Sequence, residues 1–309
     1  MDVILHLGVH RTGSTSFQDY MARSSWARVA YWGPKITRGG LFDGVQGSPA
    51  GMRPMVRAKG RIALQLARAE ALGVDALVIS DENLIGPLRS NLRCASLYPE
   101  IGMRMARLQA AFGGRITQVA VQIRALDSYW TSALAFGVSR GIACPDADMR
   151  ARITTSSRQW QDVITELAFA LPGVPMMVTS FEQMVQSPDM VAAQITGQLA
   201  PPMPTQGIWT NRMMAASRLR SCLLDAGFTP ADPLFDQDGG WQPFSATQRR
   251  TLRTQTAADL VWLRAGADGL ATYYEHRTPE LAIRAGPDKD LIRGSQDNDS
   301  QDRHMARPC

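Results

Sequence analysis

The chain has 309 residues, of which 45% are hydrophobic and 20% are charged, and its formal net charge is +5. These proportions are typical of a globular protein with a sizeable core, and no stretch reaches the roughly 18 apolar residues that a membrane span needs. The positive charge suits an anionic ligand. The arginines, however, are spread along the chain without a run of like charges or interleaved aromatic residues, which disfavours nucleic acid as a partner.

The cysteines and histidines show no metal-binding pattern. The four cysteines are far apart and form no C-x-x-C pair, and the four histidines are similarly dispersed. We therefore expect no metal site and a reducing compartment. The N-terminus leads directly into an apolar run without a basic segment or a cleavage site, which predicts a cytoplasmic protein.

Strand and helix patterns alternate in the first part of the chain. Apolar runs predict buried parallel strands at residues 2–7, 76–80, 117–123 and 175–179. Apolar periodicity predicts helices between them, at residues 16–23, 57–72 and 102–112. This alternation indicates an α/β fold with a doubly wound parallel sheet. Ligands in such sheets bind beyond the carboxyl ends of the strands, so the loops after Leu7, Ser80 and Ile123 should share one rim.

The second part of the chain has a different pattern. We expect helices at residues 190–199, 213–226, 246–265 and 269–275. Residues 33–54 are rich in glycine and proline and predict a long surface loop, whereas the polar residues 286–309 predict a disordered tail. The expected organisation is one α/β domain over residues 1–285, with its sheet core in 1–185 and a helical continuation in 186–285.

The loop after the first strand has the spacing of a phosphate-binding loop. Gly8, Gly13, Ser14 and Thr15 fit G-x-x-x-x-G-S-T, in which glycines let backbone N–H groups converge on phosphate oxygens at a helix N-terminus. A nucleotide triphosphatase would have lysine at position 14, and here the cation is Arg11 instead. The alternative is a tight corner with Ser14 or Thr15 as the helix N-cap.

A second pattern follows the third strand. Arg124 ends this strand, and Ser132 lies eight residues later on the expected helix, so both could bind one phosphate. The alternatives are an ion pair of Arg124 with Asp127 and a solvated or back-bonded serine. Tyr129 and Trp130 between them are expected in the core.

The segment LHLGVHRTGSTSFQ resembles the phosphosulfate-binding loop of the sulfotransferases that use PAPS, 3'-phosphoadenosine 5'-phosphosulfate. The resemblance implies a three-layer P-loop fold, with a central parallel sheet flanked by helices. It implies that Arg11 and the following loop hold the 5'-phosphosulfate, and that an arginine and a serine eight residues apart hold the 3'-phosphate. The residues assigned to PAPS in this way are Arg11, Thr12, Gly13, Ser14, Thr15, Ser16, Arg124 and Ser132.

The family usually has lysine where this chain has Arg11. An arginine binds sulfate oxygens bidentately but does not readily donate a proton to a leaving phosphate, so we expect it to stabilise charge. The expected general base is Glu82, just beyond the second strand, because carbohydrate-type members of the family use a glutamate in this role. Asp81 competes for it, and Ser80 or Asp81 could instead cap a helix. His10 could contact the sulfate or pack internally.

The sequence therefore predicts a sulfotransferase that moves a sulfuryl group from PAPS to a hydroxyl or amine of a small molecule, glycan or lipid, releasing PAP, adenosine 3',5'-bisphosphate. Arg11 and Glu82 are its expected catalytic residues, and no metal is required. A P-loop kinase or NTPase is one alternative. A nucleotide-binding protein without catalytic activity is another. The acceptor and the oligomeric state stay open.

Overall fold

The computed structural model describes residues 1–46, 51–142, 145–202, 215–225, 227, 234–236 and 239–275. Over these residues the protein is α/β, with six parallel strands in the order β2-β3-β1-β4-β5-β6. The strands are β1 (Asp2–His6), β2 (Val29–Trp32), β3 (Ala76–Ser80), β4 (Gln118–Ile123), β5 (Met176–Ser180) and β6 (Thr272–Tyr274). The tail expected to be disordered, residues 286–309, lies outside the described residues.

The helices surround this sheet. In chain order they are α1 (Ser14–Arg23), α2 (Pro34–Ile36), the π-helical η1 (Thr37–Leu41), α3 (Met52–Ala71), the 3-10 helix η2 (Glu82–Ile85), α4 (Leu88–Cys94), α5 (Ile101–Phe112), α6 (Leu126–Ser139), α7 (Ala147–Thr155), α8 (Trp160–Ala170), α9 (Phe181–Met184), α10 (Pro188–Thr196), α11 (Ala216–Asp225), α12 (Ala246–Arg264) and the 3-10 helix η3 (Ala267–Gly269). Residues 1–275 form one compact unit.

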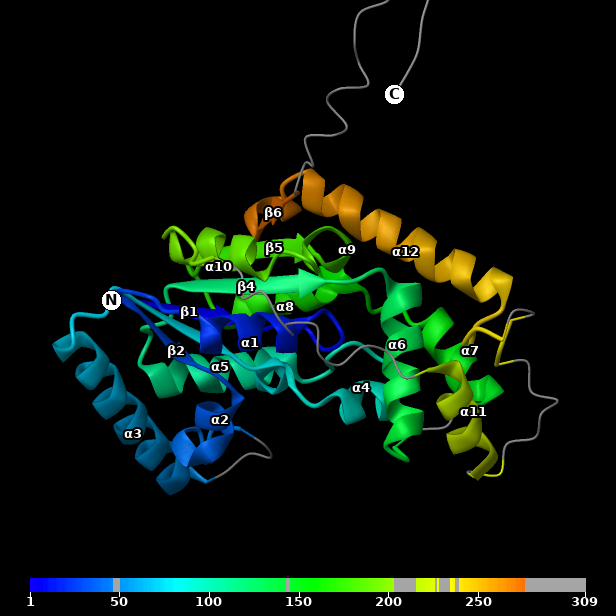
Figure 1. Cartoon of the computed structure of the whole chain (residues 1–309), viewed down its shortest axis with the longest axis horizontal. Helices are drawn as coiled ribbons and strands as arrows, with labels where there is room; N and C mark the ends of the chain where they lie inside the picture. The colour runs from blue at the N-terminus through cyan, green and yellow to red at the C-terminus, as the bar shows by residue number, and fades with distance from the viewer. Residues whose placement is uncertain are drawn as a thin grey trace, which may run out of the picture. The chain divides into compact units, whose positions relative to one another are not determined.

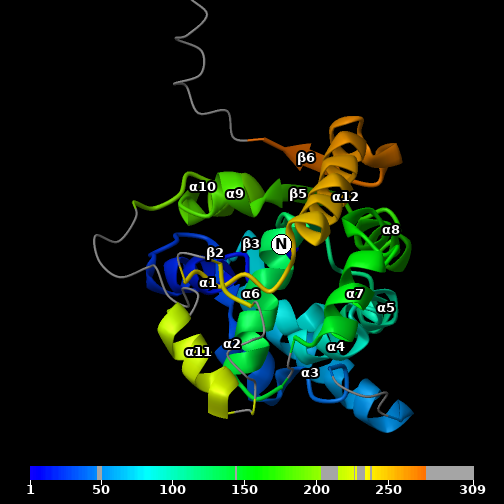
Figure 2. The same cartoon turned by 90° about the vertical axis from the view of Figure 1, so that its right-hand side faces the viewer.

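The alternation of side chains along β1 divides the core into two layers. Val3 and Leu5 point to one face, where they join buried residues of α3, α5 and α8. Ile4 points to the other face, where it joins buried residues of α1 and α10. Figures 1 and 2 show helices on both sides of the sheet. The expected three-layer arrangement, helices on both faces of a parallel sheet, is confirmed.

The four expected strands are present, each within one residue of its expected bounds. The two edge strands were not predicted. β2 has only Trp32 buried, and β6 is three residues long, so neither forms the apolar run of a central strand. The helix expected over residues 269–275 is wrong, because this segment pairs with β5 as β6 after the short helix η3.

The described part of residues 33–54, namely 33–46 and 51–54, has more regular structure than expected. In place of a long loop, the described residues contain α2, η1 and the start of α3. Thr37 and Arg38 of η1 both donate hydrogen bonds to the carboxylate of Asp81, just beyond β3. This polar contact, which spans more than 40 positions of sequence, fixes the segment against the rim of the sheet.

The late helix α12 is connected to the middle of the chain by a buried carboxylate. Asp259 accepts hydrogen bonds from the backbone N–H groups of Trp160 and Gln161, at 3.2 and 3.0 Å, and so caps the start of α8. Burial raises the pKa of Asp259 to about 6.

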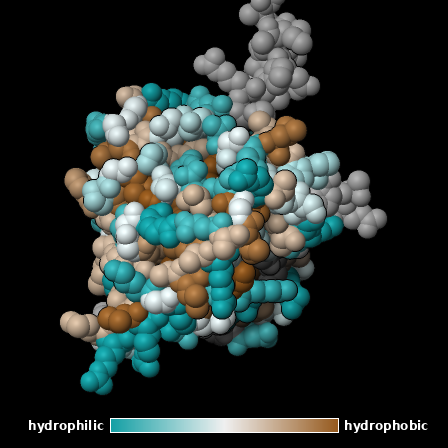
Figure 3. All heavy atoms as spheres, turned by 90° about the vertical axis from the view of Figure 1, so that its left-hand side faces the viewer, coloured by the Kyte–Doolittle hydropathy of each residue, from teal (hydrophilic) through white to brown (hydrophobic). Residues whose placement is uncertain are grey.

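The topology brings three loops together at one edge of the sheet. β1 lies between β3 and β4, and His6 at its end aligns with Ser80 and Ala120. The carboxyl ends of these strands point toward α6 (Figure 1). Figure 3 shows the opposite end, where hydrophobic side chains are scattered among hydrophilic ones. In the part of the chain that the structure describes, no helix combines the length and the apolar character needed to cross a bilayer.

Candidate functional site

The glycine loop, residues 8–16, leaves β1 while still bound to β4. The N–H of Leu7 donates to the carbonyl of Ala120 at 2.9 Å, and the N–H of Val9 donates to the carbonyl of Gln122 at 3.1 Å. The loop therefore starts as a continuation of the sheet, which fixes its position relative to the end of β4.

Three residues of this loop have a positive φ. Gly8 and Gly13 lie at +79° and +78°, where glycine is favoured. A Cβ at Gly8 would also lie 3.3 Å from the Cβ of Glu82. Arg11 has φ +63°, which is uncommon for a residue with a side chain and is found at functional sites. The backbone thus turns sharply at the position that carries the cation.

The start of α1 does not have Ser14 or Thr15 as its N-cap, which was the alternative to a phosphate-binding loop. Gly13 is the N-cap residue and makes no side-chain cap, so neither Ser14 nor Thr15 has that role. The helix begins at Ser14. The positive N-terminal end of α1 therefore faces the loop. The hydroxyl of Thr12 donates to the carbonyl of Val9 at 2.7 Å.

The backbone of Ser16 lies in the first turn of α1. Its N–H donates to the carbonyl of Gly13 at 2.9 Å. The assignment of Ser16 to the anion-binding loop stays a prediction.

Arg11, Ser132 and Arg124 come together although they are far apart in sequence. The Nε of Arg11 donates to the Oγ of Ser132 at 2.9 Å. One terminal nitrogen of Arg124, Nη1, donates to the carbonyl of Arg11 at 2.7 Å. The loop after β1 and the loop after β4 therefore form one site at neighbouring strand ends.

The guanidinium groups of Arg11 and Arg124 form no ion pair with any carboxylate of the described residues. Burial lowers the pKa of both, and for Arg124 the charge of Arg11 adds to this lowering while Glu182 opposes it. The Nε of Arg124 is buried and has no hydrogen-bond partner among the residues that the structure describes. An anion between the two groups would relieve both the repulsion and the unmet donor.

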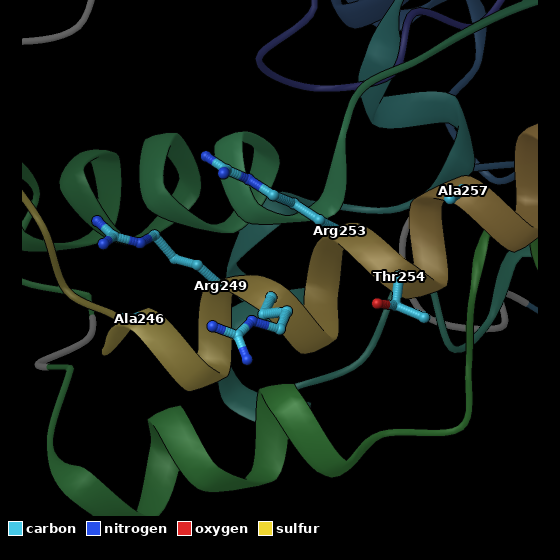
Figure 4. A pocket seen from close by; sticks show the side chains of 6 residues that line it. Ala246, Arg249, Arg253, Thr254 and Ala257 are labelled. Atoms are coloured by element: carbon cyan, nitrogen blue, oxygen red, sulfur yellow. The ribbon is translucent and has the colours of Figure 1, made fainter.

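The alternative pairing of Arg124 with Asp127 is wrong. Asp127 instead accepts a hydrogen bond from the Nε of Arg253 in α12, at 2.6 Å. Figure 4 shows Arg249 and Arg253 extending from α12 in a similar direction. Arg124 instead donates a hydrogen bond to the glycine loop, at the carbonyl of Arg11.

Phe181 and Glu182 at the end of β5 complete this part of the site. The ring of Phe181 lies 4.3 Å from the Cζ of Arg124, a cation–π contact. A Cβ at Gly13 would be 3.9 Å from the same ring. Glu182 accepts a hydrogen bond from the N–H of Ala125 at 3.0 Å, just before α6. We did not predict this role for either residue, and the only sequence signal was their position after a strand.

The carboxylates of Asp81 and Glu82 have different environments. Asp81 is fully buried and accepts hydrogen bonds from Thr37, from Arg38 and, as the cap of η2, from the N–H of Asn83. The capping role considered for Asp81 is therefore confirmed. The side chain of Glu82 is 17% exposed. Of the two carboxylates, only Glu82 can meet a substrate.

Glu82 is held as an anion. Its two oxygens accept hydrogen bonds from Gln18 at 2.9 Å and from Arg38 at 3.1 Å. Burial acts to raise the pKa of Glu82, but charges and hydrogen bonds outweigh it and the pKa lies below its ordinary value. The charge interaction with His10 and the hydrogen bond from Gln18 contribute most to this lowering, and Arg38 adds to it. Burial lowers the pKa of His10.

The two histidines near the loop are held internally. Nδ1 of His10 lies 3.1 Å from the hydroxyl of Tyr98, and its Nε2 lies 3.1 Å from the amide of Asn83. Both ring nitrogens are used, so packing explains His10 without a sulfate. Nδ1 of His6 lies 2.8 Å from the Oγ of Ser80. Tyr129 and Trp130 are buried, as expected.

Comparisons with known proteins gave no match. No protein-family model matches the chain, no curated protein matches it, and no solved structure matches it. Within the described residues, no group of three or more His, Cys, Asp or Glu side chains could hold a metal ion.

Proposed function

We propose that the protein is a PAPS-dependent sulfotransferase. The observation that carries this proposal is the convergence of Arg11, Ser132 and Arg124 beside the glycine loop, at the ends of two adjacent strands. Two half-buried guanidiniums that form no ion pair within the described residues suit a ligand with two anionic groups. PAPS has such groups at its 5' and 3' positions, and the resemblance of the loop to the phosphosulfate-binding loop supports the same ligand.

The residues divide into two groups by the part of PAPS that they would bind. Arg11 and the backbone of residues 12–16 would bind the phosphosulfate, aided by the positive end of α1. Arg124 and Ser132 would bind the 3'-phosphate, with Phe181 holding the guanidinium of Arg124 in place. Arg11 touches Ser132, so the two groups are in direct contact.

The reaction needs a base and a means of stabilising charge. An acceptor hydroxyl or amine attacks sulfur, the bond between sulfur and the 5'-phosphate oxygen breaks, and PAP leaves. Glu82 would take the acceptor proton, and Arg11 would stabilise the charge that develops on the leaving oxygen. As an arginine, Arg11 would not donate a proton to that oxygen.

The acceptor would be a hydroxyl or amine of a small molecule, glycan or lipid. Cys94 and Cys222 are free thiols, which supports a reducing compartment and hence a cytoplasmic location.

The P-loop kinase or NTPase alternative has less support. Ser14 stands where those enzymes have lysine. The carboxylate of Asp81, which follows the strand next to β1, already accepts hydrogen bonds from Thr37, Arg38 and Asn83. It is therefore committed to protein donors and poorly placed to help hold magnesium.

A binding titration and a transfer assay test the proposal. We expect PAP to bind in calorimetry in the presence of EDTA, and we expect radiolabelled sulfate to move from PAPS to an acceptor in metabolite fractions. Nucleotide turnover that requires magnesium and ATP, without PAP binding, would instead establish the kinase or NTPase. Tight PAP binding without transfer to any acceptor would indicate a binding protein that lacks catalysis.

A further inference from the structure

One face of α6 runs from the glycine loop toward the end of the helix. Ser132, Phe136 and Arg140 follow one another at intervals of four residues, so they lie along one side of α6 and its C-cap. The Cζ of Arg11 lies 5.7 Å from the centre of the Phe136 ring, and the Cζ of Arg140 lies 5.4 Å from it. The Cζ atoms of Arg11 and Arg140 are therefore at most about 11 Å apart.

Arg140 lines a cavity of about 540 Å³, a size that suits a small molecule. Its walls come from α4, from the end of α6 and from α7 with the residues before it. Its charged lining consists of Arg89, Arg93, Arg140, Arg152, Asp146 and Asp148. We call it the arginine cavity.

The carboxylates of the arginine cavity do not neutralise it. Asp146 accepts a hydrogen bond from the N–H of Met149 at 2.8 Å and caps α7. The Oδ2 of Asp148 lies 3.8 Å from the Nη1 of Arg152. In the described parts of the chain, Arg89, Arg93 and Arg140 make no ion pair. The cavity therefore has an excess of positive charge close to Arg11.

A second arginine-rich hollow, of about 410 Å³, provides a comparison. It is lined by residues of α12 alone, among them Arg249, Arg250 and Arg253. Arg253 is already paired with Asp127. Of the described residues, none of Ser132, Phe136 and Arg140 lines this hollow.

We propose that the arginine cavity binds the anionic part of the sulfate acceptor. This inference rests on the proposed sulfotransferase function. Arg11 would hold the phosphosulfate, and its Cζ lies within about 11 Å of the Cζ of Arg140, because both guanidiniums contact the Phe136 ring. The acceptor is therefore an elongated molecule that carries a carboxylate or phosphate roughly 10 Å from the hydroxyl or amine that attacks sulfur. Carboxylates and phosphates can both accept two parallel hydrogen bonds from one arginine.

Calorimetric titrations of the full chain test this proposal with two probes, pyrophosphate for phosphate acceptors and citrate for carboxylate acceptors. The protein is first saturated with PAP so that the glycine loop is filled. We expect at least one probe to bind, and the stronger probe identifies the acceptor group. Arg93→Glu and Arg140→Glu should each weaken that binding at least tenfold.

The matched control is Arg250→Glu, which makes the same charge change in the α12 hollow and should leave probe affinity unchanged. Circular dichroism and thermal melts show whether each variant is folded. Equal losses in all three variants, no binding of either probe, or displacement of PAP by the probe would each overturn the proposal. If the wild type binds no PAP but its pyrophosphate binding still depends on Arg93 and Arg140, the anion site is supported and the proposed function is not.

Discussion

The Nε of Arg11 lies 2.9 Å from the Oγ of Ser132, although the two residues are 121 positions apart in the chain. The hydrogen bond joins the loop after β1 to the helix after β4. Since the carbonyl of Arg11 also accepts a hydrogen bond from Arg124, the backbone and the side chain of one residue connect both halves of the proposed PAPS site. Changes on either side should therefore affect the whole site.

Arg124→Ala should weaken PAP binding at least tenfold, about 1.4 kcal/mol. The variant removes a charge from the proposed 3'-phosphate site, together with its hydrogen bond to the carbonyl of Arg11. Calorimetry on the purified proteins measures this. Arg253→Ala is the control, because Arg253 pairs with Asp127 in the first turn of α6 and has no proposed role in binding PAP. The affinity of this variant for PAP should match that of the wild type. An unchanged affinity in Arg124→Ala would remove Arg124 from the site.

Arg11→Lys should bind PAP and should transfer sulfate at least as fast as the wild type. Lysine keeps the positive charge and can also donate a proton to the leaving phosphate, whereas arginine cannot readily do so. Arg11→Ala should reduce kcat about a hundredfold or more, as removal of a charge-stabilising donor does in other enzymes. Steady-state kinetics with PAPS compares the three proteins. Full activity in Arg11→Ala would contradict a catalytic role.

Glu82→Gln should lower kcat by about two orders of magnitude, the typical contribution of a general base. Glutamine keeps the size of the side chain and can still accept from Gln18 or Arg38, but it cannot take a proton. PAP affinity should stay within about twofold of the wild type, because Glu82 would contact the acceptor and not PAP. A parallel loss of PAP affinity would show that Glu82 acts by holding the loop rather than as a base.

His6 should make folding stability depend on pH. Burial lowers its pKa from 6.5 to about 4, so in this range the unfolded chain binds a proton that the folded protein does not. The free energy of unfolding should therefore fall as pH decreases from 6.5 to 4, by roughly 2–3 kcal/mol from this group. His6→Gln cannot titrate, so the stability of the wild type relative to this variant should decrease over the same range in urea titrations. A constant difference would show that the pKa of His6 is not lowered.

The sequence predicted the centre of the sheet well, because buried parallel strands form apolar runs that can be recognised locally. It also predicted that the loops after β1, β3 and β4 would share one rim. The contacts of Arg124 and Ser132 with Arg11 lie at this rim. The edge strands β2 and β6 were missed. Each is short and only partly buried, and each is defined by its partner strand rather than by its own residues.

Other parts of the site depend on contacts that no local pattern encodes. Phe181 lies under Arg124 only because β5 pairs with β4. Arg38 reaches Asp81 and Glu82 from a segment that looked like an irregular loop. Asp127 pairs with Arg253, which follows it by 126 positions, and not with its near neighbour Arg124. Such pairings require the complete fold.

The capping of α8 by Asp259 limits how the protein can be shortened. A fragment that ended near residue 185 would contain every residue proposed to bind PAPS, yet the N–H groups of Trp160 and Gln161 would lose their acceptor. It would also expose the edge of β5 that β6 now covers, a surface prone to aggregation. We therefore expect a minimal expression fragment to extend at least to Glu275, because the proposed PAPS site depends on a sheet and a helix that α12 and β6 complete.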